Sequence, residues 1–192
     1  MSNSVSVRLN KIQLGFPKLF VPQAMPGVTG AKPKYSAMLV IPMGPEADKV
    51  SEALTQIYQG EFKGKGEIRS PMKLAWDSPT GGYAGSELYK DKYIMNASNM
   101  TRPGVVDHNL TSLSEDSAQG ILYPGSLANV SITLAPYNMQ MNKGISCYLE
   151  AVQLIGGGER LDFRRPASEI FEKVEATPMP EEPAGVIPSF LQ

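Results

Sequence analysis

Glycine and proline interrupt this sequence so often that long helices have little room to form. The 192 residues contain 18 glycines and 16 prolines, and both residue types mark turns and end regular elements. Hydrophobic residues make up 42% of the chain, which is enough to bury a core. The composition therefore predicts a turn-rich domain made mostly of short β-strands.

Two stretches alternate between apolar and polar residues, as half-buried strands do. Residues 127–137 place on one face Ala128, Val130, Ile132 and Leu134. In residues 5–16 the parity changes, because Val5, Val7 and Leu9 alternate in one phase and Ile12, Leu14 and Phe16 in the other. A β-bulge near Asn10 and Lys11 would bring both sets to one core, and a bent first strand is typical of small barrels.

The remaining elements follow from turn residues and short apolar runs. Asn142, Lys143 and Gly144 predict a hairpin turn into a strand at 145–155, and the glycines at 156–158 predict a turn into a last short strand. Further strands are expected at 35–41, 72–76, 93–97 and 104–107. Residues 17–33 and most of 61–92 are expected to be loop.

One helix is expected, at residues 45–59. Pro45 suits a first helical position, Gly60 suits a C-cap, and an apolar stripe consists of Ala47, Val50, Leu54 and Ile57. The predicted fold is thus mainly β, a small antiparallel barrel of seven or eight strands with one principal α-helix and long loops.

The charge is distributed unevenly along the chain. Residues 1–165 hold 17 bases and 14 acids, whereas residues 166–192 hold five acids and one base. Four prolines from Pro178 onward oppose regular structure there. We expect one folded domain at 1–165 and a flexible, acidic, proline-rich tail at 166–192. Three roles are open for this tail: it occupies a basic groove when nucleic acid is absent, it offers Phe190 to the pocket of a partner protein, or it is an inert, solvated terminus.

Several function classes find no support in the residues. One cysteine, Cys147, and one histidine, His108, do not make a disulfide or the usual metal sites. The glycines near Lys65 do not have phosphate-loop spacing. We therefore expect no catalysis, no cofactor and no metal, with a metal-dependent enzyme using Asp107 or His108 as a rival hypothesis. The sequence shows neither a signal peptide nor a membrane span, so the cytoplasm is the expected location.

The clearest functional signal in the sequence is a set of lysine and arginine residues interleaved with aromatic residues. Flat rings stack on nucleobases, and nearby cations neutralise phosphates. The candidate phosphate contacts are Lys32, Lys34, Lys63, Lys65, Lys73, Lys90, Lys92, Arg102 and Lys143. The candidate stacking rings are Tyr35, Trp76, Tyr83, Tyr89 and Tyr93, with Tyr137 a weaker one. The alternative for each ring is a place in the core.

Several short motifs occur in a familiar order: Lys34-Tyr35-Ser-Ala-Met-Leu-Val-Ile-Pro42, Gly82-Tyr-Ala-Gly85, Asn96-Ala-Ser, Arg102-Pro-Gly-Val-Val-Asp107 and Asn142-Lys-Gly-Ile-Ser-Cys147. Over residues 5–162 the chain resembles bacteriophage single-stranded DNA-binding proteins. The resemblance implies an OB-fold barrel, binding of single-stranded DNA in replication or recombination, and a tail that regulates binding.

The same resemblance sets expectations for partners. Single-stranded DNA is the expected partner, with duplex DNA when the tail is removed, replication proteins through the tail, and a homodimer as further candidates. The tail differs from the usual ending of such proteins, because Leu191 and Gln192 follow Phe190 and the acids are few. A non-enzymatic structural or assembly module of a phage is the alternative function.

Overall fold

The computed structural model describes residues 4–24, 27, 29–66, 68–75, 86–139 and 142–161. The chain divides into two units, Met1–Asp162 and Phe163–Gln192, and the second unit lies outside the described residues. The predicted tail at 166–192 therefore stays a prediction. The described strands are β1 (Val5–Gln23), β2 (Lys34–Pro42), β3 (Met72–Leu74), β4 (Lys92–Asn99), β5 (Gly104–Val106), β6 (Leu127–Met139) and β7 (Asn142–Leu154). The described helical elements are α1 (Pro45–Ile57), α2 (Glu115–Ala118), a π-helical turn at Tyr58–Phe62 and a 3-10 turn at Glu87–Tyr89.

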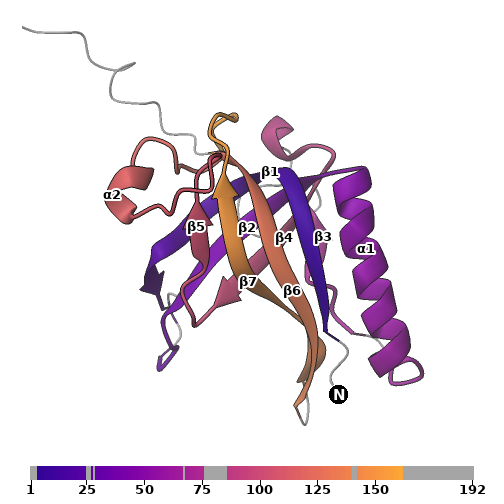
Figure 1. Cartoon of the computed structure of the whole chain (residues 1–192). Helices are drawn as coiled ribbons and strands as arrows, with labels where there is room; N and C mark the ends of the chain where they lie inside the picture. Colours follow the sequence, from indigo (N-terminus) through magenta and orange to yellow (C-terminus); the bar gives the residue numbers. More distant parts are fainter. Residues whose placement is uncertain are drawn as a thin grey trace, which may run out of the picture. The chain divides into compact units, whose positions relative to one another are not determined.

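In the described part of the chain, seven strands form one sheet in the order β3-β4-β2-β1-β6-β7-β5 (Figure 1). All neighbours pair antiparallel except β5 and β7, which are parallel. The sheet curls until β4 meets β7, where Asn99 Nδ2 donates to the carbonyl of Leu149 at 3.2 Å. A bridge between Arg69 and Gly144 lies at the same seam. These contacts confirm a mainly β, barrel-like fold.

Strand β1 bends twice. Its pairing with β6 shifts between Leu9 and Ile12, and Lys11 takes a left-handed φ of 48°. The predicted bulge is thereby confirmed, because Leu9 and Ile12 are both fully buried. A second shift follows Gly15 in the pairing with β2, and there Phe16 has φ 45° and is 52% exposed. The predicted inward position of Phe16 is therefore wrong.

The predicted loop at 17–33 is also wrong in its first part, because β1 continues to Gln23. After the second bulge Lys18 pairs with Ser36, and the strand ends with Gln23 opposite Lys34. Pro17 lies at the register shift between Gly15 and Lys18, which is a position in a sheet where proline is tolerated.

Helix α1 lies beside the sheet and contributes to the same core (Figure 1). Ala47, Val50, Ala53 and Ile57 are buried in it, as the apolar stripe predicts, with Leu54 partly buried. Gly60 is not a C-cap, because the chain continues from Ile57 into the π-helical turn Tyr58–Phe62, which contains this glycine. The turn also buries Phe62.

The β6–β7 hairpin is longer than predicted. Ala128, Val130, Ile132 and Leu134 are buried as expected. Asn142, Lys143 and Gly144, however, pair with Met139, Asn138 and Tyr137. They belong to β7 rather than to a turn, and the chain reverses between Met139 and Asn142.

The glycines at 156–158 make a close backbone contact. Of the short strand predicted after them, residues 159–161 are described and are not in a strand, and the rest lies outside the described residues. Each of these glycines has a positive φ, and the amide of Leu127 donates to the carbonyl of Gly157 at 3.1 Å. A Cβ on Gly125 would lie 2.0 Å from the carbonyl oxygen of Glu159. Only glycine lets these two backbone segments approach so closely.

Candidate nucleic-acid interface

Strands β1, β2, β4 and β3 turn one side to the core and the other side outward. Leu39 and Ala97 belong to the core, so the residues next to them in each strand face outward. The register places Lys18 beside Ser36, and Ser36 beside Ser98, across three adjacent strands. We call the polar outward residues the sheet-face site; they are Lys18, Lys34, Ser36, Lys73, Lys92, Asn96 and Ser98.

The four lysines of this site differ in their surroundings. Lys34 and Lys73 are exposed, and Lys18 is half-buried. Lys92 Nζ donates to Gln13 Oε1 at 2.8 Å, which holds its ammonium over the neighbouring strands. Burial lowers the pKa of Lys92, and the charge of Glu159 opposes that shift. The site therefore combines one fixed cation with three that are at least partly open to solvent.

An apolar cluster covers part of the same outward face. Met38 and Val40 pack there with Ala75, Tyr89 and Leu161. Tyr89 is only 1% exposed, so its ring cannot stack on a base. The structure contradicts the stacking prediction for Tyr89, and the core alternative holds for this ring.

The other predicted rings have different positions. Tyr35 and Tyr93 have the parity of the buried residues Ala37 and Met95, so both half-buried rings face the core side. Tyr137 is paired with Gly144, and a Cβ on that glycine would lie 2.8 Å from the tyrosine hydroxyl, so the ring covers the glycine. Trp76 and Tyr83 lie outside the described residues.

Three predicted cations lie in loops. Lys32 is exposed before β2. Lys90 Nζ lies 3.5 Å from Glu87 Oε2, an exposed pair too weak to keep Lys90 from a phosphate. The guanidinium of Arg102 lies 5.2 Å from the centroid of the Phe20 ring, within cation–π range.

The three other predicted cations gather where the sheet closes. Lys143 Nζ donates to the carbonyl of Lys65, and Arg69 bridges to Gly144. The loop after the π-helical turn is thereby held against the start of β7. We call this group the seam cluster; it consists of Lys63, Lys65, Arg69 and Lys143.

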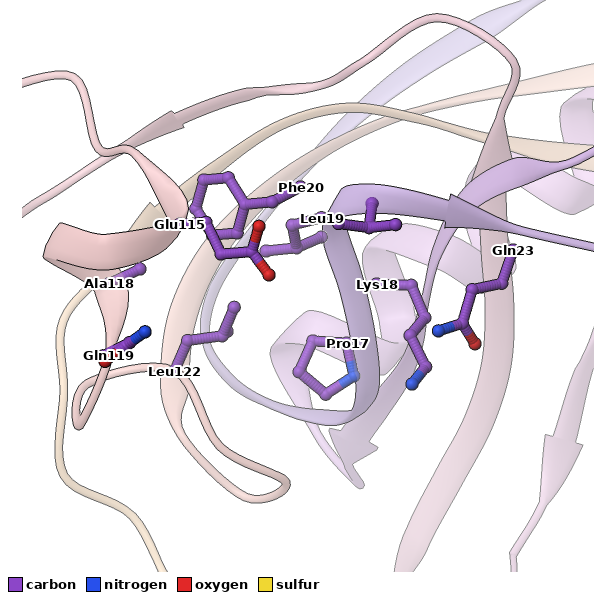
Figure 2. A pocket seen from close by; sticks show the side chains of 10 residues that line it. Pro17, Lys18, Leu19, Phe20, Gln23, Glu115, Ala118, Gln119 and Leu122 are labelled. Atoms are coloured by element: carbon purple, nitrogen blue, oxygen red, sulfur yellow. The ribbon is translucent and has the colours of Figure 1, made fainter. Parts of the chain in front are cut away.

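Sequence reasoning missed Lys18 of the sheet-face site, and also Phe20, whose ring lies under the guanidinium of Arg102, because both residues fall in the segment predicted as loop. The apolar run Leu19-Phe20-Val21 was a weak signal for a strand. Phe20 and Lys18 also line a hollow of about 280 Å³ between the second half of β1 and the α2 region (Figure 2). Ala118 and Leu122 form its other wall.

The residues considered for catalysis are engaged in hydrogen bonds of the fold or are buried. Asp107 Oδ1 accepts hydrogen bonds from the amides of Asn109 and Thr111, both at 2.8 Å. The hydrogen bond from the Thr111 amide has the largest effect and lowers the pKa of this carboxyl; desolvation opposes it, and the Asn109 amide lowers the pKa further. Burial raises the pKa of Cys147 to about 12. Within the described ranges, no group of three His, Cys, Asp or Glu side chains could hold a metal ion.

Of the helices that the structure describes, none is long and apolar enough to cross a membrane.

Comparison with known proteins places these features in a family. The model of the family described as Enterobacter phage Enc34, ssDNA-binding protein, matches residues 5–181. The protein p50 of Acyrthosiphon pisum secondary endosymbiont phage 1 is 30% identical to this chain over 169 residues. The alignment covers 81% of this chain and 85% of that protein.

Two solved structures share the fold. The single-stranded DNA-binding protein from bacteriophage Enc34, in complex with ssDNA, is similar with a TM-score of 0.68 and 19% identity, covering 82% of this chain and 89% of that one. The single-stranded DNA-binding protein gp2.5 of bacteriophage T7 is similar with a TM-score of 0.51 and 15% identity, covering 85% and 98%.

Proposed function

Because the chain belongs to the ssDNA-binding protein family of Enterobacter phage Enc34, we propose that it binds single-stranded DNA with little sequence preference and without catalysis. The observation that carries this proposal is the sheet-face site. Four lysines and three hydrogen-bonding side chains lie on one side of four adjacent strands. Lysines on such a surface neutralise phosphates, and the release of counterions drives binding.

Base stacking would come mainly from the segment that contains Trp76 and Tyr83. Of the described residues, Ala75 immediately before this segment and Leu88 three positions after it both pack on the outward face with Met38 and Val40. Each stacked base contributes about 1–3 kcal/mol in comparable proteins.

The acidic tail would compete with DNA for the same lysines. Five acids and one base in residues 166–192 complement a body with an excess of bases. Removal of the tail is proposed to tighten binding and to extend it to duplex DNA. Phe190 offers a contact for replication proteins, and self-association into a homodimer is a further proposed property. The place of action would be the cytoplasm of a host cell, in DNA replication or recombination.

Fluorescence of Trp76, the single tryptophan, tests the binding proposal. Oligo-dT should quench it, and the midpoint of the titration should rise steeply with salt, while a duplex of the same length should bind more weakly. The alternative, a structural or assembly module, predicts no quenching and no shift in the mobility of the oligonucleotide at any salt concentration. A nuclease assay with Mg²⁺ beside the Asp107→Asn variant tests the metal-dependent rival.

A further inference from the structure

A cavity lies next to the seam cluster, on the far side of β3 from the sheet-face site. It has a volume of about 620 Å³ and lies between the end of α1, the loop before β3 and the start of β7. Its lining residues are Leu54, Thr55, Tyr58, Gln59, Lys63, Ile68, Ser70, Pro71 and Ile145. Pockets that hold small molecules have volumes of about 300–1,000 Å³, so this cavity is large enough for a single nucleobase.

The wall formed by α1 includes an unusual local structure. The helix changes at Tyr58 into the π-helical turn, a distortion that is frequent at functional sites. Phe62 of this turn is buried, whereas Tyr58 lines the cavity and is 40% exposed. A large ring left this open contributes little to the core, and its face is available to another flat group.

The positive charge near the cavity indicates that a flat ligand bound there would carry negative charge. Lys63 lines the cavity itself. Lys143 Nζ donates to the backbone carbonyl of Lys65. The backbone of Arg69 bridges to Gly144, which follows Lys143 in β7. A cavity of mixed apolar and polar lining that includes an exposed tyrosine and Lys63, with the other residues of the seam cluster next to it in the fold, is complementary to an aromatic base attached to an anionic backbone.

The cavity and the sheet-face site are close to each other along the chain. Ser70 lines the cavity, and Lys73 of β3 is an outward residue of the site. Three residues of chain span at most about 10 Å, so a bound strand that contacts Lys73 can also reach the mouth of the cavity.

We propose that this cavity receives a nucleobase of the bound single strand, with Tyr58 stacking on the base and the seam cluster contacting the adjoining phosphates. The inference rests on the proposed function. It extends the DNA path beyond the outward face of the sheet, around the edge strand β3, to the end of α1.

The test compares Tyr58→Ala, Tyr58→Phe and Tyr148→Ala in the full-length chain. Tyr148 is a matched control, because it is 41% exposed and lies on the opposite side of β7 from Ile145. Fluorescence anisotropy with labelled oligo-dT is expected to show about tenfold weaker binding for Tyr58→Ala, which corresponds to one stacked base. Tyr58→Phe and Tyr148→Ala should bind like the unmodified chain.

An oligonucleotide of the same length with abasic sites provides the decisive control. The difference between Tyr58→Ala and the unmodified chain should vanish on it, because no base is left to stack. Equal binding of Tyr58→Ala and the unmodified chain to oligo-dT would overturn the inference while leaving the proposed function intact. Tighter binding by Tyr58→Ala would also overturn it, by indicating that the cavity holds a competing segment such as the acidic tail. If the unmodified chain does not bind oligo-dT, the proposed function itself fails.

Discussion

Replacing Lys18, Lys34 and Lys73 together by glutamine should flatten the salt dependence of DNA binding. These three cations lie on the outward face of adjacent strands and are at least partly exposed, so the fold should tolerate the change. Each contact between a cation and a phosphate of a single strand adds about 0.7 to the slope of log K against log salt. Loss of three contacts should lower the slope by about 2.

The same arithmetic gives the loss of affinity. At 0.1 M salt a slope of about 0.7 per contact corresponds to about 1 kcal/mol. Three contacts then amount to about 3 kcal/mol, or roughly a hundredfold weaker binding. Fluorescence anisotropy with a labelled oligo-dT, at five or more salt concentrations, measures both quantities.

A second triple variant controls for net charge. Arg8, Lys11 and Lys49 lie outside the sheet-face site, and their replacement by glutamine removes the same charge. This control should keep the slope of the unmodified chain to within about 0.5. The reasoning is refuted if the two triple variants lose slope and affinity equally, because binding would then follow total charge and not a surface.

Three further predictions concern the fold. Gly125→Ala should lower the free energy of unfolding by about 3 kcal/mol in urea titrations, because its φ is +109° and the new Cβ would meet the Glu159 carbonyl at 2.0 Å; an unchanged midpoint would refute the close approach. Ser126→Ala should raise the same free energy by about 1 kcal/mol, since the Ser126 hydroxyl is buried and has no hydrogen-bond partner among the described residues; a loss of stability would contradict this. Cys147 should resist a thiol reagent at pH 8 until the chain is unfolded, because burial raises its pKa to about 12; rapid labelling of the folded chain would show that the thiol is accessible.

The sequence was most informative where a residue's neighbours in the chain decide its environment. The parity change between Leu9 and Ile12 predicted the bulge, since both side chains must reach one core. The stripe of α1 and the alternation of β6 predicted their buried faces for the same reason.

The sequence-based predictions failed where contacts between residues distant in the sequence determine whether a side chain is buried or which strand it joins. Tyr89 is buried because Met38 and Val40 of β2 offer it an apolar surface, which nothing near Tyr89 in the chain reveals. The second bulge after Gly15 restores the pairing of β1 with β2, so Pro17 does not end the strand and Lys18 joins the sheet-face site. The gathering of Lys63, Lys65 and Lys143 depends on the closure of the sheet, which brings residues about 80 positions apart into contact.

The central claim is that an unpaired strand lies along the outward face of β1, β2, β4 and β3. Ultraviolet crosslinking of the full-length chain to oligo-dT, followed by mass-spectrometric mapping of the linked peptides, tests it most directly. Crosslinks are expected in residues 16–36, 70–76, 83 and 92–102. Crosslinks confined to the outward side of β6 and β7, around Ser131 and Tyr148, would contradict it.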